Sequence, residues 1–159
     1  MLKINLRCTE RLLALVALTC IFCQPATAAP RWELVGSYKA DDGADATAWI
    51  DLNSLIRTQN LTRVWVVYDY SKFQVGDWVE EPGKSTTYSK SYMSSRQIIV
   101  IDCATKDQGY GAWAALDGPK GTGSPIHSIN LPVPTKADQP VPPGSVGEAI
   151  SEAACKQRR

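Results

Sequence analysis

The sequence predicts an α+β fold: an antiparallel sheet of about six strands, with a C-terminal helix packed on one face and tied to it by a disulfide. Three observations favour this fold. Short runs rich in β-branched and aromatic residues recur between turn-forming residues, a pattern that is typical of β-strands. Near the C-terminus the apolar residues change to helical spacing. Cys103 and Cys155 are the cysteines that remain when an N-terminal export signal is removed.

The N-terminus has the order of residues that is typical of a secretory signal peptide. Three basic residues precede an apolar run over residues 12–23, and Ala26-Thr27-Ala28 then fits the A-x-A rule. We therefore expect residues 1–28 to be cleaved. The apolar run is shorter than the roughly 20 residues that a membrane-spanning helix needs, and neither Cys20 nor Cys23 lies in a convincing lipoprotein signal. The prediction is a protein exported to the periplasm, the cell surface or the medium.

Residues 29–159 are the predicted single domain, and they are numerous enough to bury a core. In an oxidising compartment the two cysteines of this domain pair, so we expect a disulfide between Cys103 and Cys155. Closing a loop of this length stabilises the fold by about 4 kcal/mol on the chain-entropy estimate. The chain has 17 basic and 16 acidic residues without a basic run. Its charge therefore gives no indication of a nucleic-acid partner.

The first expected elements are a hairpin and a short helical turn. Residues 32–38 and 47–50 predict two strands, joined by a turn rich in Asp and Gly. Residues 51–56 predict a single helical turn, with Asp51 placed to cap it.

Two later segments carry the strongest strand signals. Residues 62–70 are rich in Val, Trp and Tyr, and residues 88–102 end in the run Ile98-Ile99-Val100-Ile101. Because this run is apolar on both faces, it predicts a central strand. The polar stretch 74–85 between the two segments predicts a loop.

The C-terminal part combines weaker strands, a proline-rich crossing and the helix. Residues 110–116 and 125–130 are strand candidates, and the prolines of residues 132–143 predict a stiff segment outside any central ladder. Ser145 and Glu148 have the spacing of a capping box, and an apolar stripe follows them.

The predicted disulfide would place this helix. Side chains alternate along a strand, so Cys103 shares a face with Ile99 and Ile101. A bond to Cys155 would therefore clamp the helix onto that face, although Cys155 lies off the apolar stripe of the helix.

Several short motifs in a fixed order resemble a known family. They are Trp49-Ile50-Asp51, Ser54-Leu55-Ile56-Arg57, Val64-Trp65-Val66, Tyr68-Asp69-Tyr70, Ser89-Lys90-Ser91 and Asp102-Cys103, with the closing helix and Cys155 after them. From about Trp32 to Cys155 the chain resembles the surface-adhesin protein E family. The resemblance implies a six-stranded antiparallel sheet whose concave face holds a disulfide-tethered helix. It also implies binding of host matrix proteins, and haem binding is associated with the family too. The chain departs from the family pattern in its missing lipobox and its proline-rich crossing.

No catalytic or metal-binding residue is predicted. The sequence has no G-x-S-x-G, H-E-x-x-H or C-x-x-C-H motif and a single histidine, His127. His127 is either an ordinary strand or surface residue or, with a tyrosine as the other choice, an axial ligand of non-covalently bound haem. Asp41, Asp42 and Asp45 form either a calcium-binding loop or a solvated turn, and the twelve-residue spacing of a calcium loop is missing.

The chain has five tryptophans, and large aromatic side chains are common at binding surfaces. We expect Trp49 and Trp65 in the core. Trp78 lies in the predicted loop among acidic residues, where we expect it to be exposed. Trp78 and His127 are therefore the candidate ligand-binding residues.

The leading functional hypothesis is a non-enzymatic binding protein of the cell envelope, with adhesin-like recognition of a host or envelope protein. The first alternative is a periplasmic module that binds a small ligand such as haem or a sugar, and the second is an enzyme of unrecognised type. A sheet covered by one helix leaves a face and two edges open, so a homodimer through either is also an expectation.

Overall fold

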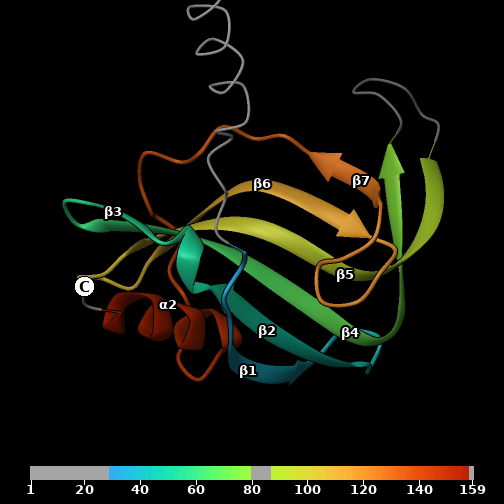
Figure 1. Ribbon diagram of the computed structural model, residues 1–159, viewed down its shortest axis with the longest axis horizontal. Coiled ribbons are helices and arrows are strands. Elements are labelled where there is room, and N and C mark those ends of the chain that lie inside the picture. The colour runs from blue at the N-terminus through green and yellow to red at the C-terminus, as the bar shows by residue number, and fades with distance from the viewer. Residues whose placement is uncertain (1–28, 80–86, 158–159) are drawn as a thin grey trace, which may run out of the picture.

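The structure of the chain, a computed structural model, describes residues 29–79 and 87–157 (Figure 1). The predicted signal peptide 1–28 and residues 80–85 of the expected loop lie outside this range. The elements in chain order are β1 (Trp32–Lys39), β2 (Asp45–Asp51), the 3-10 helix η2 (Leu52–Ser54), β3 (Ile56–Thr58), β4 (Leu61–Val79), β5 (Thr87–Asp102), β6 (Gln108–Leu116), β7 (Pro125–Ile129) and α2 (Val146–Lys156).

The strands form one antiparallel sheet in the order β1-β2-β4-β5-β6-β7, with β3 paired to β4 outside this path. This confirms the predicted α+β fold. The predicted β1–β2 hairpin is present. The predicted cap of the helical turn after it is present too, since the Asp51 carboxylate accepts a hydrogen bond from the Asn53 amide at 3.0 Å. The helical turn is shorter than expected and ends at Ser54, because Ile56–Thr58 pairs back on β4 as the short strand β3.

The long β4–β5 hairpin differs most from the sequence-based expectation. The prediction of a loop from Gln74 is wrong, because residues 74–79 continue β4 and pair with residues 87–92 of β5. The pairing shifts register between Asp69 and Gln74, and such an irregularity bends a strand. Figure 1 shows the outer part of the hairpin turning away from the rest of the sheet and rising beside β7.

The core lies between α2 and one face of the sheet, which we call the helix face. Ile150 and Ala154 of α2 are fully buried against side chains of β2, β4 and β5 that alternate onto this face, namely Ala48, Ile50, Val64, Val66, Ile99 and Ile101. The capping box is confirmed in part. Ser145 Oγ accepts from the Glu148 amide at 3.2 Å, but the Glu148 carboxylate accepts from the Gly144 amide at 2.6 Å rather than from that of Ser145.

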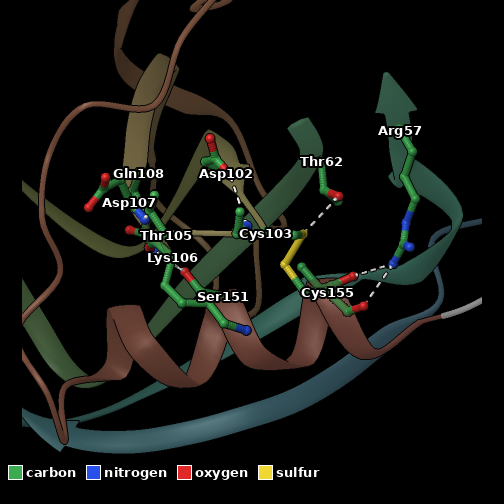
Figure 2. Close-up of a disulfide and its surroundings, with 12 residues drawn as sticks. Arg57, Thr62, Asp102, Cys103, Thr105, Lys106, Asp107, Gln108, Ser151 and Cys155 are labelled. Carbon is green, nitrogen blue, oxygen red and sulfur yellow. Dashed lines mark hydrogen bonds between the residues drawn. A yellow bond between two sulfur atoms is a disulfide. The ribbon is translucent and has the colours of Figure 1, made fainter. Parts of the chain in front are cut away.

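The predicted disulfide joins the turn after β5 to the end of α2, with Cα atoms of Cys103 and Cys155 5.7 Å apart (Figure 2). Arg57 of β3 donates to the carbonyl oxygens of Ala154 and Cys155 at 2.8 and 3.3 Å. These carbonyls have no partner within the helix, so Arg57 caps the same end of α2 that the disulfide anchors. The disulfide therefore clamps α2 onto the helix face, as the alternation of side chains along the strand predicts.

The opposite face of the sheet is partly covered by the segment between β6 and β7. There the Asp69 carboxylate accepts from the Lys120 amide at 2.6 Å, and Arg96 Nε donates to the Gly121 carbonyl at 2.8 Å. The expectation that Trp49 and Trp65 belong to the core is wrong. Both point to this opposite face, where Trp49 is half-buried and Trp65 is 36 % exposed.

Candidate binding site

The helix face is divided into two parts along the strands. Val64 and Val66 of β4 lie in the core under α2, whereas Tyr68, the next residue on the same face, packs against the edge of this core, and Tyr70 follows it along the strand. The helix is only 11 residues long, so it covers one part of the face and leaves the other to aromatic side chains.

An open groove occupies this second part, with a volume of about 370 Å³. We call it the tyrosine groove, and its lining side chains come from β1, β4, β5 and β6. They are Tyr38, Tyr68, Tyr70, Ser95, Gln97, Tyr110 and Trp113. None of these residues is Asp, Glu, Lys, Arg or His. The groove therefore presents aromatic faces together with hydroxyl and amide groups, and no formal charge.

Burial raises the pKa of four phenols in this region. Desolvation, followed by the neighbouring Tyr70 hydroxyl, raises the pKa of Tyr38 well above its ordinary value, and desolvation is the first cause of the raised pKa of Tyr68 and Tyr110. Desolvation, the neighbouring Tyr70 and the Asp42 carboxylate raise the pKa of Tyr92 from 10.0 to about 12. A neutral phenol can both donate and accept a hydrogen bond.

The rings of Trp78, His127 and Tyr92 form a second aromatic group, which we call the Trp78 stack. It adjoins the tyrosine groove through Trp113. The Trp78 and His127 rings are stacked, with centroids 4.9 Å apart and an interplanar angle of 18°. Trp113 lies 6.4 Å from Trp78 and 6.2 Å from His127, and Tyr92 lies 5.9 Å from Trp78. The bend in the β4–β5 hairpin thus brings a side chain of β4 over the far strands of its own sheet.

Glycine at position 76 permits this arrangement. The Trp78 indole folds back over Gly76, and a Cβ atom at position 76 would lie only 2.8 Å from the indole Cε2. Contacts this short are essentially never made by real side chains, so any other residue here would push Trp78 from its place.

A buried amide connects the groove to α2. Gln108 is 1 % exposed, and its Nε2 donates to the Gly147 carbonyl at 2.8 Å and to Ser151 Oγ at 2.9 Å. Its Oε1 accepts from the Tyr110 hydroxyl at 3.0 Å. The position of Tyr110 in the groove therefore depends on the helix that the disulfide holds in place.

A second hollow, of about 600 Å³, borders the groove, since Tyr38 and Tyr70 line both. Its rim includes two exposed apolar residues, Phe73 and Val75, at 58 % and 69 % exposure. Asp42 lies on the same rim and pairs with Lys72 at 3.3 Å. Tyr38 and Tyr70 thus form a ridge between an uncharged groove and a wider hollow with charged residues at its edge.

The two candidate ligand-binding residues of the sequence analysis come together in the structure. Trp78 is half-buried in a strand, so the expectation of an exposed loop residue is wrong, and His127 lies in β7 as a half-buried strand residue. The tyrosines of the groove were missed. The alternation that places Tyr68 and Tyr70 on one face was readable, but their meeting with Tyr38 and Trp113 depends on register across several strands. Haem ligation by His127 stays a prediction.

Comparison with known proteins assigns the class of the domain. The family model for surface-adhesin protein E matches residues 32–156. Two crystal structures of Haemophilus influenzae protein E are similar in fold. Crystal form II is 16 % identical, with 80 % of this chain and 93 % of that chain covered and a TM-score of 0.46. The selenomethionine form is 15 % identical, with 81 % and 93 % covered and a TM-score of 0.48. No curated protein matches the chain.

A sheet with a disulfide-tethered helix on one face is the class of domain that the structure defines. The chain belongs to the surface-adhesin protein E family, and it is an adhesin-like binding protein of the cell envelope. Within residues 29–79 and 87–157, no helix is long and apolar enough to cross a membrane.

Proposed function

We propose that this chain is exported through a cleaved signal peptide, is displayed on the cell surface and binds a host protein without catalysing a reaction. The helix-face surface formed by the tyrosine groove and the Trp78 stack would make the contact. The observation that carries this proposal is the gathering of tyrosine and tryptophan side chains from the four strands β1, β4, β5 and β6 on one open surface. Aromatic residues of these two types dominate the binding energy of many protein interfaces.

Display on the surface can be tested by protease treatment of intact native cells. We expect the mature domain to be lost from intact cells while a periplasmic marker protein survives. Protection of both until the outer membrane is opened would place the domain in the periplasm and contradict the proposal.

Binding can be tested with the purified mature domain on a panel of immobilised matrix proteins such as laminin, fibronectin and collagen. We expect saturable binding to at least one of them, with serum albumin as the negative control. Binding to none would contradict recognition of a host matrix protein. Association of the domain with itself, through the uncovered face of the sheet or an edge strand, stays a prediction, to be checked by light scattering on the same sample.

A further inference from the structure

A separate cleft lies beside the C-terminal end of α2 and shares no lining residue with the tyrosine groove. Its volume is about 530 Å³, within the roughly 300–1,000 Å³ that is usual for small-molecule sites. We call it the arginine cleft. Its lining comes from the residue before β1, the segment from η2 to β3 and the residue after α2. The lining residues are Arg31, Leu52, Asn53, Leu55, Ile56, Arg57 and Gln157, and none of them is acidic.

The fold brings the two arginines of this cleft together from separate segments. Arg31 is held beside η2 by its backbone, since its amide donates to the Asp51 carboxylate at 2.9 Å and its carbonyl accepts from the Leu52 amide at 2.9 Å. Arg57 projects from β3 towards the end of α2, as Figure 2 shows. Both guanidinium groups therefore line the same cleft.

These guanidinium groups keep most of their hydrogen-bond donors available. Within residues 29–79 and 87–157, the Arg31 side chain makes no hydrogen bond or ion pair. In the same part of the chain Arg57 bonds only through Nη2, which donates to the last carbonyls of α2. A guanidinium matches the geometry of a carboxylate or a phosphate and binds either through paired hydrogen bonds. The arginine cleft is therefore suited to an anionic group.

The remainder of the lining combines two occupied amides with an apolar wall. Asn53 Nδ2 already donates to the Ala29 carbonyl at 2.6 Å, and Gln157 Nε2 donates to the Glu33 carboxylate at 3.3 Å. The other lining residues are aliphatic, namely Leu52, Leu55 and Ile56. Ile56 is 47 % exposed, so a ligand that covers it removes apolar surface from water. A ligand that satisfies both parts of the cleft has an anionic head and a hydrocarbon chain.

We propose that the arginine cleft binds an anionic amphiphile, whose carboxylate or phosphate pairs with the two guanidinium groups while the first part of its acyl chain lies along the aliphatic wall. The head loses water on binding but gains two cationic partners, and the chain gains from burial. A free fatty acid and a membrane phospholipid share this chemistry. An acidic peptide could pair with the arginines but would leave the aliphatic wall uncovered. The site is separate from the tyrosine groove and does not rest on the proposed function.

The test is a calorimetric titration of the mature domain with decanoate. Acetate has the same head without the chain, and 1-decanol has the same chain without the charge. We expect saturable binding of decanoate that is at least about tenfold tighter than the binding of either control compound.

Arg31 is the residue to replace, because its side chain supports no other contact in the described part of the chain. We expect Arg31→Gln to weaken decanoate binding at least about fivefold, through the loss of charge-assisted hydrogen bonds, and Arg31→Lys to weaken it less. Lys39→Gln removes the same charge at the other end of β1 and should change binding less than about twofold, the scale of an exposed charge remote from the ligand. Urea denaturation of each variant checks that the fold is kept.

Vesicles distinguish the two sources of the amphiphile. Sedimentation with phosphatidylglycerol vesicles that Arg31→Gln abolishes would identify a membrane phospholipid, with neutral phosphatidylcholine vesicles as the control. Decanoate binding without vesicle binding would identify a free fatty acid. Either result supports the inference, and binding of neither decanoate nor phosphatidylglycerol vesicles would overturn it.

Two other outcomes would also overturn the inference. One is binding of acetate or of a capped oligoglutamate peptide as tightly as decanoate. The other is a loss of decanoate binding with Trp113→Ala rather than with Arg31→Gln, because the ligand would then occupy the tyrosine groove. Matrix-protein binding is measured on the same variants. If it is absent while decanoate binds, the proposed function fails alone, and the reverse result contradicts only the amphiphile site.

Discussion

Replacing both Cys103 and Cys155 by serine should lower the stability of the domain by about 4 kcal/mol. The disulfide closes a separation of 52 residues, and the loss of chain entropy that such a cross-link imposes on the unfolded state gives this figure. The folded state should change little, because the buried residues Ile150 and Ala154 and the cap from Arg57 still hold α2 in place. For a domain of this size we expect the melting temperature to fall by about 15 °C.

Urea denaturation of the mature domain, with and without a thiol reductant, measures this effect. Reductant should destabilise the wild-type domain by about the same amount as the double substitution and should leave the variant unchanged. The m-value should rise for the variant, because its unfolded chain exposes more surface. A loss below about 1 kcal/mol, or a variant that still responds to reductant, would refute the reasoning.

Three further predictions concern the core, the tyrosines and the Trp78 stack. Ile150→Ala should cost about 2–5 kcal/mol in a urea titration, because a fully buried side chain leaves a cavity. A raised phenol pKa, as for Tyr92 at about 12, means that the fold favours the neutral form. This stabilisation is complete below pH 10 and is lost as the pH rises towards 12, so tyrosinate absorbance should appear later in the native than in the urea-unfolded domain. Gly76→Ala should displace the tryptophan stacked on the β7 histidine, change the near-UV circular dichroism and cost about 1 kcal/mol. Gly36→Ala, whose Cβ would meet only an ordinary 3.7 Å contact, should do neither.

Local patterns in the sequence were sufficient to predict most of the fold. The cap at Asp51, the capping-box serine at Ser145 and the central strand ending in Ile98–Ile101 each depend on neighbouring residues and are confirmed. The disulfide is confirmed as well. It could be predicted because only two cysteines remain after the predicted signal peptide.

The site could be predicted only in fragments, because it depends on relations between distant strands. Trp78 was assigned to a loop since its neighbours are polar, yet pairing with β5 keeps it in β4 and the register shift after Asp69 turns it over the sheet. The contact between Tyr38 and Tyr68, at 6.2 Å between ring centroids, follows from the register of β1, β2 and β4. Trp65 is not in the core as expected, because alternation with its buried neighbours places it on the opposite face.

The most direct test of the account is a comparison of two tryptophan variants in binding to one matrix protein by surface plasmon resonance. Trp113 lines the tyrosine groove and contacts the Trp78 stack, whereas Trp65 lies on the opposite face. We predict that Trp113→Ala weakens binding at least about tenfold and that Trp65→Ala changes it less than about twofold. Equal effects of the two substitutions, or a loss only with Trp65→Ala, would contradict a binding site on the helix face.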